Sequence, residues 1–118
     1  MFHAKLSDGL LLKRLIESLR ELVHEVNLDV QSTGLTVQAM DASHIALVAL
    51  RLSSDGFEEF RCDKAMALGV ALPSLAKVLR VCETGDSVTL DCEEKNREKL
   101  RVGFENGSKY IYIYNIYI

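Results

Sequence analysis

The stretch Leu35–Arg51, LTVQAMDASHIALVALR, decides the fold, because its pattern predicts two strands joined by a polar turn. Every second residue from 35 to 39 is apolar, the period of two that is typical of a half-buried strand. The run Ile45–Leu50 is entirely apolar, which favours a strand covered on both faces or one that passes under a helix. Asp41–Ser43 forms the expected turn, and His44 follows where the chain re-enters the sheet.

The composition predicts one globular domain. The chain has 118 residues, of which 48% are apolar, so it is long enough to bury one core. The formal net charge of −3 excludes a surface coated in basic residues but allows local basic patches. Neither a secretory segment nor a run of 18 apolar residues is present in the sequence, which predicts a soluble, intracellular protein without a membrane span.

The cysteines and histidines do not predict a metal or cofactor site. Cys62, Cys82 and Cys92 are three in number and widely spaced, and no CxxC or Cys/His grouping occurs. They are expected to be buried or half-buried free thiols in a reducing compartment. His3 and His24 have no partner at ligand spacing.

Outward from the central hairpin, the sequence predicts a β-α-β-β-β pattern that occurs twice. The expected elements, in order, are a strand at Phe2–Leu6, a helix from Gly9 to Val26 with Asp8 as N-cap, strands at Asn27–Ser32, 35–40 and 45–53, a short extra strand at Phe57–Cys62, a strand at 65–72, a helix at 74–82 after Pro73, and strands at 87–93, Lys99–Glu105 and 109–118. This order predicts an α+β domain whose two helices pack side by side on one face of antiparallel sheets.

The first helix has a wide apolar stripe, and both helices carry basic residues on their outward sides. The expected core stripe is Leu11, Leu12, Leu15, Leu19, Leu22, Val23 and Val26. The basic residues are Lys13, Arg14 and Arg20 on the first helix and Lys77 and Arg80 on the second. A solvated helical face, partly neutralised by Glu17 and Glu21, is the simplest interpretation. Acidic residues gather instead in the strand turns, and this division suits sequence-independent contact with phosphates.

The sequence does not predict an enzyme. It contains no glycine-rich phosphate loop, no GxSxG and no HExxH motif. Asp41, Ser43 and His44 stand together, but the members of a catalytic triad converge from distant segments. Asp41 and Ser43 are therefore expected to form the turn.

Three segments resemble the N-terminal domain of the eukaryotic sliding-clamp family, proliferating cell nuclear antigen. They are the opening MFHAKL with LLLKRLIESLRELVHE, the hairpin LTVQAMDASHIALVALRL, and GFEEFRCDKAMALGVALPSLAKVLR. The resemblance runs from Met1 to about Glu105, and the motifs QAMDASHIALV and GFEEFRCDK are the specific ones. It implies a DNA-clamp fold.

The resemblance also implies a function. Clamps of this family are nuclear, non-enzymatic rings of six such domains that encircle duplex DNA, with basic helices lining the hole and sheets forming the outer wall. A clamp loader, DNA polymerases and other replication and repair proteins are the partners implied, the latter binding through short peptides. By position, Lys13, Arg14, Arg20, Lys77 and Arg80 match the DNA-facing cations, and Met40, His44 and Leu47 match one wall of the partner-peptide pocket.

Two departures from the family are apparent. The family's interdomain linker and second domain are missing from these 118 residues, so the sequence is expected to be a single clamp domain, family-like over 1–105 and atypical over 106–118. The atypical segment begins with the hairpin signal Asn106-Gly107 and ends in KYIYIYNIYI, a Tyr/Ile alternation with no charge after Lys109. A substitute edge strand, the altered end of a shortened gene product and an engineered tail all agree with it.

An uncharged Tyr/Ile edge strand is prone to pair with a neighbour, which predicts self-association. Tyr110, Tyr112 and Tyr114 are the expected subunit interface, and a homo-oligomer is expected, for which six single-domain copies supply the domains of one ring. The alternative is a truncated clamp fragment that does not close a ring and acts as a partner-binding or assembly regulator or is inactive. A checkpoint-type clamp subunit is a third, more distant interpretation.

Overall fold

The fold follows the predicted order of elements. The computed structural model describes residues 1–41, 43–96, 99–106 and 110–117, and for residues 96 and 110–117 it describes the backbone alone. The elements are β1 (Phe2–Leu6), α1 (Gly9–Arg20), β2 (Glu25–Gln31), β3 (Gly34–Met40), β4 (Leu47–Ser53), β5 (Glu59–Cys62), β6 (Met66–Ala71), α2 (Leu72–Leu79), β7 (Ser87–Cys92), β8 (Lys99–Asn106) and β9 (Tyr110–Tyr117). The β-α-β-β-β pattern therefore occurs twice, with β5 as the additional strand, as predicted.

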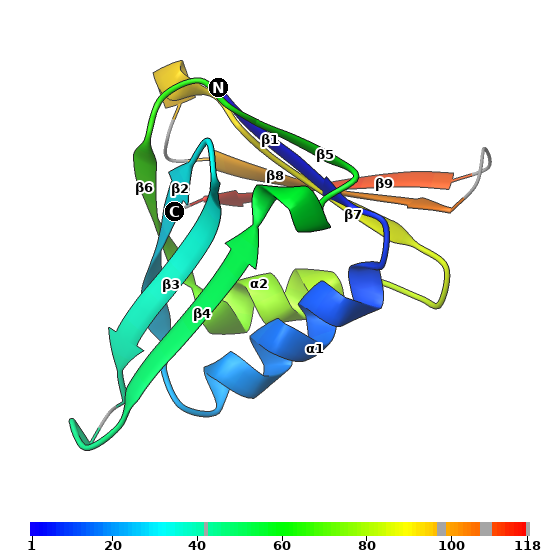
Figure 1. The fold of residues 1–118 in the computed structure, drawn as a ribbon. Helices are drawn as coiled ribbons and strands as arrows, with labels where there is room; N and C mark the ends of the chain where they lie inside the picture. The colour runs from blue at the N-terminus through cyan, green and yellow to red at the C-terminus, as the bar shows by residue number, and fades with distance from the viewer. Residues whose placement is uncertain (42, 97–98, 107–109, 118) are drawn as a thin grey trace.

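The strands form two antiparallel sheets. The five-stranded sheet has the order β5-β1-β7-β8-β9, and the four-stranded sheet has the order β4-β3-β2-β6. α1 and α2 lie side by side and pack against each other on the inner side of the sheets (Figure 1). This arrangement confirms the α+β clamp-type architecture.

One hydrophobic core lies between the two sheets and the helix pair. In β2, Val26, Leu28 and Val30 are buried while the residues between them are exposed, so the strand buries one face only. Each fully buried aliphatic side chain of this kind contributes about 1.5–3 kcal/mol through the hydrophobic effect. In the part of the chain that the structure describes, no helix is long and apolar enough to cross a membrane.

The central hairpin is confirmed in part. β3 alternates as predicted and pairs with β4 along its whole length, from Gly34 opposite Ser53 to Met40 opposite Leu47. Gly34 has a φ of +148°, and a Cβ there would lie 2.3 Å from the Leu52 carbonyl oxygen, so the tight start of the hairpin requires glycine.

Of the two expectations for the second hairpin strand, that it is covered on both faces or passes under a helix, the first is wrong. β4 begins only at Leu47 and lies at the edge of the four-stranded sheet, where its residues alternate between exposed and half-buried. Ile45 precedes the strand and is 86% exposed. The continuous apolar run therefore buries only one face in part. Because β4 is an edge strand, its outward-pointing residues meet no other described element.

The predicted core stripe of α1 is also corrected. The buried residues are Gly9, Leu12, Ile16 and Leu19, whereas Leu11 is 45% exposed. α1 is apolar around more than one side, and the side that carries Gly9 is the buried one. The Gly9 amide donates to the Asp86 carbonyl at 2.9 Å, and a Cβ on Gly9 would meet that same oxygen at 2.8 Å.

The first helix is shorter than predicted. α1 ends at Arg20, and β2 begins at Glu25, because Val26 pairs with Val70 of β6 instead of continuing the helix. Asp8 occupies the N-cap position, as predicted, but its side chain makes no capping hydrogen bond. In α2, Pro73 lies in the first turn, as predicted, where a missing N–H costs nothing.

Candidate functional site

The tip of the β3–β4 hairpin is organised by Asp41. Its Oδ2 accepts a hydrogen bond from the Ser43 hydroxyl at 2.8 Å, and its Oδ1 accepts from the backbone amides of Ile45 and Ala46 at 3.0 and 3.1 Å. These bonds, led by that from Ser43, lower the pKa of the Asp41 carboxyl below its usual value. Asp41 and Ser43 are turn-forming residues, as predicted.

The same geometry differs from that of a catalytic triad. In a triad the histidine lies between the hydroxyl and the carboxylate, whereas here Ser43 bonds directly to Asp41. The His44 amide donates to the Asp41 carbonyl at 3.0 Å, and His44 adopts a left-handed φ of +60°. His44 therefore takes part in the turn through its backbone, and its exposed side chain remains available to a partner.

An exposed apolar patch surrounds this tip. Met40 is 46% exposed and Leu47 58% exposed, and the two residues stand opposite each other in the β3–β4 register. The structure therefore brings Met40, His44 and Leu47, which were predicted as a pocket wall, to one end of the hairpin. Ile45 enlarges the patch and was missed, because its place in an apolar run suggested a covered strand. Their role in binding stays a prediction.

The five predicted DNA-facing cations lie on the packed helix pair. Lys13 and Arg20 are half-buried, and Arg14, Lys77 and Arg80 are exposed. Within the described chain none of the five forms an ion pair with a carboxylate, so the positive charges are not neutralised by close contacts. Their role toward DNA stays a prediction.

Part of this placement has an explanation within the fold. The Lys13 ammonium donates to the Cys82 carbonyl at 3.4 Å, just beyond the end of α2. Arg20 and Lys77 lie in the last turns of their helices, and Arg80 is the C-cap of α2. Cations near a helix C-terminus interact favourably with the helix dipole and stabilise the helix by about 0.3–1 kcal/mol each. Within the described part of the structure, Arg14 is the one member of the five without such an internal role.

The predicted subunit interface lies on β9. This strand pairs with β8 over its full length, from Tyr110 opposite Asn106 to Tyr117 opposite Lys99, and forms an edge of the five-stranded sheet. The side chains of Tyr110, Tyr112 and Tyr114 lie outside the described part of the structure. The placement at an edge leaves one side of the β9 backbone unpaired among the described strands.

The outer face of the five-stranded sheet holds a charge network that sequence reasoning missed. The His3 ring bonds through Nδ1 to Asp91 and through Nε2 to Glu59 at 3.0 Å. Partial burial alone would lower the pKa of His3, but the hydrogen bonds to Asp91 and Glu59 outweigh it and raise the pKa. The partners are 88 and 56 residues away along the chain, so no local pattern could have revealed them.

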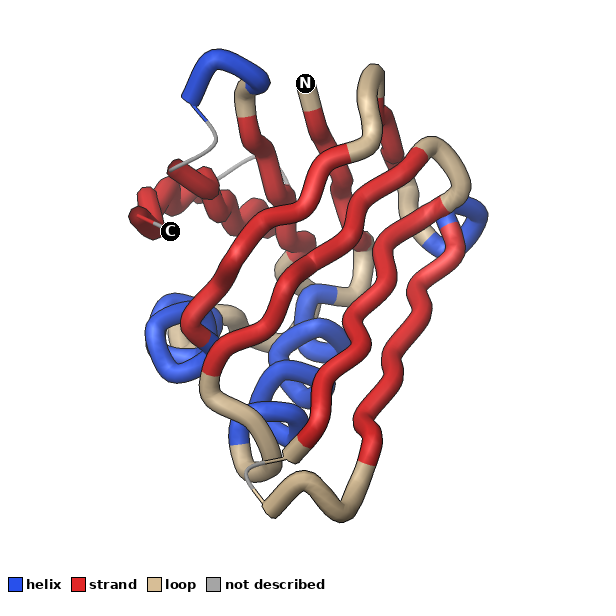
Figure 2. Tube along the Cα trace, turned by 90° about the vertical axis from the view of Figure 1, so that its left-hand side faces the viewer, coloured by secondary structure: helices blue, strands red, loops and turns tan. Residues whose placement is uncertain are grey.

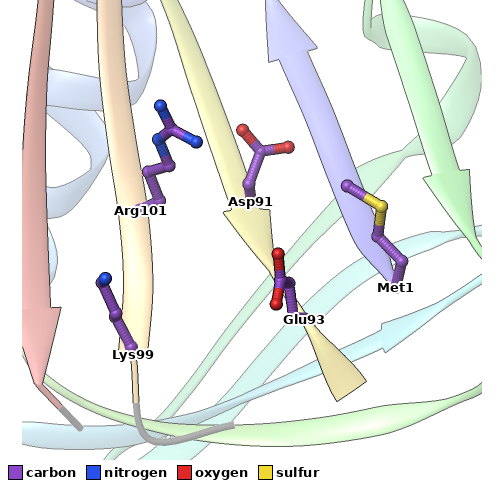
Figure 3. Close-up of a pocket in the computed structure, with 5 residues that line it drawn as sticks. All are labelled: Met1, Asp91, Glu93, Lys99 and Arg101. Atoms are coloured by element: carbon purple, nitrogen blue, oxygen red, sulfur yellow. The ribbon is translucent and has the colours of Figure 1, made fainter. Parts of the chain in front are cut away.

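A small pocket of about 210 Å³ adjoins this network (Figure 3). Asp91 on β7 and Glu93 just after it supply acidic groups, Lys99 and Arg101 on β8 supply basic ones, and Met1 closes one side. The charges balance, and they belong to neighbouring strands of the sheet. In the described residues no group of three histidine, cysteine or acidic side chains gathers as a metal site.

Comparisons with known proteins find a matching family and a similar relative. The family profile described as "Proliferating cell nuclear antigen, N-terminal domain" matches residues 1–117. Proliferating cell nuclear antigen 2 of Drosophila melanogaster is 43% identical to this chain over 109 residues, which are 92% of the chain and 42% of that protein. The chain therefore spans less than half of the length of this relative.

Proposed function

The chain belongs to the proliferating cell nuclear antigen family, and we propose that it acts as a DNA sliding-clamp domain that helps encircle duplex DNA and tethers polymerases and repair proteins to it. As a clamp it would have no catalytic activity and require no cofactor. The nucleus is its proposed location.

The observation that carries this proposal is the pair of adjacent helices, whose cations have no carboxylate partner among the described residues. Lys13, Arg14 and Arg20 on α1 and Lys77 and Arg80 on α2 supply the proposed DNA contacts, on a chain whose net charge is −3. Lysine and arginine bind phosphates without reading the bases. An acidic body with a local basic surface would hold DNA weakly and at any sequence, as sliding requires.

The proposed partner surface is the hairpin tip. Met40, His44 and Leu47 would receive the apolar anchor of a short peptide from a DNA polymerase, a clamp loader or another clamp-binding protein. Exposed apolar patches of this kind commonly mark protein-binding sites. Asp41 supports the site, because its three hydrogen bonds fix the loop between the two strands.

Assembly is proposed to use the β9 edge. A second copy would pair with the strand that carries Tyr110, Tyr112 and Tyr114, because an unpaired edge offers a full row of backbone hydrogen-bonding groups. Six copies of one domain would then supply the domains of a ring.

The mass in solution and the behaviour on DNA test the proposal together. We expect multi-angle light scattering to give a hexamer, and we expect the protein loaded on DNA to be retained on a closed circle and lost when that circle is linearised. A monomer or dimer that is lost equally from both DNAs contradicts the ring.

The alternative function is a partner-binding or assembly regulator that does not close a ring. The exposure of Ile45 and Leu47 favours it, because that patch is accessible on the single domain without any assembly. A monomer that binds anchor peptides at the hairpin tip but is not retained on circular DNA is the result expected of this function.

A further inference from the structure

The three methionines of the chain lie in different environments. Met40 is 46% exposed and Met1 is 36% exposed, whereas Met66 is only 5% exposed. Met66 belongs to the hydrophobic core and stands opposite Val30 in the β2–β6 register. A small solute can therefore reach Met40 and Met1 in the folded chain, but not Met66.

Met40 belongs to the exposed hairpin tip. It is the last residue of β3 and stands opposite Leu47, the first residue of β4. Leu47 and the nearby Ile45 are 58% and 86% exposed. Figure 2 shows this end of the four-stranded sheet projecting past the helices. Met40 is thus the one methionine of the chain that belongs to the proposed partner surface.

The fold does not use the Met40 side chain. Among the described residues, those that form the core or pack against it do not include Met40. The hairpin is closed instead by backbone and carboxylate bonds: the Asp41 amide donates to the Ala46 carbonyl at 2.9 Å, and the Asp41 carboxylate holds the loop. A chemical change of the Met40 side chain should therefore alter the surface and leave the hairpin intact.

Oxidation of the Met40 thioether to a sulfoxide would change the polarity of this surface. It converts a flexible apolar side chain into a polar one, with an oxygen that accepts hydrogen bonds. The Ser43 hydroxyl and the amides of the three residues after it already donate to Asp41. These donors are therefore engaged, and burying a sulfoxide oxygen of Met40 under an apolar anchor would desolvate it without a bond from any of them.

We propose that Met40 is a modification site at which a hydroperoxide switches off the partner surface. The inference rests on the proposed function and adds the regulation of the same site. The Met40 sulfur attacks one peroxide oxygen, the O–O bond breaks, and an S–O bond forms. The sulfur loses two electrons to the peroxide, and the proton of the transferred oxygen passes to the leaving oxygen, which departs as water or an alcohol.

The modification is reversible. Methionine sulfoxide reductases return the sulfoxide to the thioether, with one enzyme for each sulfur epimer. Two thiols become a disulfide in this step, and the sulfoxide oxygen leaves as water. A partner peptide that is released under oxidising conditions would thus bind again after repair.

The test compares the parent chain with Met40→Leu, each before and after treatment with hydrogen peroxide. Leucine keeps an apolar side chain of similar volume but contains no sulfur. Site-resolved mass spectrometry measures the extent of oxidation at each methionine. The affinity for a synthetic peptide, with an isoleucine and a phenylalanine as anchor in a neutral frame, measures binding. Met1 is the internal control, because Met40→Leu still carries this exposed methionine.

We expect Met40 to be oxidised well before Met66, and we expect the oxidised parent to bind the peptide about tenfold more weakly. The affinity of Met40→Leu, whatever its starting value, should be the same before and after treatment. The urea midpoint of the parent should not change while Met66 stays reduced. Treatment with both reductases should restore the original affinity.

Four outcomes overturn the inference. They are equal oxidation rates for Met40 and Met66 in the folded chain, full peptide affinity of the Met40 sulfoxide, an equal loss of affinity in treated Met40→Leu, and a loss that persists after the sulfoxide has been reduced. In each of these cases the untreated parent still binds the peptide, so the proposed partner surface stands. An untreated parent that does not bind the peptide overturns the partner surface and the switch with it.

Discussion

Gly9 and Gly69 occupy two regions that differ in what surrounds them. At Gly9 an added Cβ would lie within 2.7–2.8 Å of Val88, Asp86 and Cys82, so the helix can approach β7 only because no side chain is present. At Gly69, in the interior of β6, a Cβ would meet only the Asn27 Oδ1 at an ordinary 3.7 Å. The first glycine is explained by packing inside the molecule, and the second has no such explanation. The comparison separates a glycine that packing requires from one that packing does not require.

The largest expected effect is that of Gly9→Ala. The new methyl group overlaps a backbone carbonyl and two packed side chains, so we expect a loss of about 2–3 kcal/mol in the free energy of unfolding, partly offset by alanine's better helix propensity. Urea denaturation measures it. A variant as stable as the parent would show that α1 can shift, and Gly9 would then not define the buried face.

The next effect concerns the helix surface. Exchanging Lys13, Arg20, Lys77 and Arg80 for alanine should lower DNA retention and reduce the magnitude of the log–log salt slope of DNA binding by up to about four. Stability should fall by about 1–2 kcal/mol at most, since these cations only support helix ends. Unchanged DNA retention would show that the cations serve the fold alone.

A smaller effect is expected at the hairpin tip. Asp41→Ala removes three hydrogen bonds of an exposed loop and should weaken anchor-peptide binding about three- to tenfold. Asp41→Asn keeps an acceptor for the two backbone amides and should therefore weaken binding less. Because the pKa of Asp41 is lowered, the order of the loop is present at neutral pH and should be lost as the pH falls through that lowered pKa. Amide chemical shifts of residues 43–46 report it. Equal peptide affinities for both variants and the parent would remove Asp41 from the site.

The bonds of His3 on the outer face of the five-stranded sheet should contribute about 0.5–1 kcal/mol to the free energy of unfolding, in a pH-dependent way, as expected of a partly exposed ion pair. Because the pKa of His3 is raised in the folded protein, its bonds to Asp91 and Glu59 stabilise the fold fully below about pH 6.5 and lose that effect as the pH rises through the raised value. Denaturation of the parent and of His3→Gln across pH 5–9 tests it. A difference that grows with pH contradicts the assignment.

The smallest expected effect is that of Gly69→Ala, the counterpart of Gly9→Ala. The added methyl group meets only one ordinary contact, and alanine costs less backbone entropy than glycine, so stability should be unchanged or rise by up to about 1 kcal/mol. A clear loss of stability would show that the strand itself needs this glycine.

The order of the elements was predictable because it depends on short-range patterns. The alternation in β3, the punctuation by Pro73 and Gly34, and the Asn106-Gly107 signal before β9 each lie within a few residues. The helix pair and the two antiparallel sheets followed from that order. The turn role of Asp41 was predictable for the same reason, since its bonds reach only to Ala46.

The site was predictable only in part. Met40, His44 and Leu47 came from a resemblance, and the structure adds Ile45 and the loop bonds that present them. The partners of His3 could not be foreseen, because Glu59 and Asp91 reach it only after three strands pair.

The sequence by itself determined which segments form strands and helices and which side chains carry charge, because dihedral preferences and hydrophobic periods act between near neighbours. Only the tertiary structure decided which side of α1 is buried and that the apolar β4 lies at an exposed edge. Both depend on what packs alongside. The close approach at Gly9 is a contact between distant parts of the chain, and the edge position of β4 depends on which described strands pair with it, so no local pattern contains either.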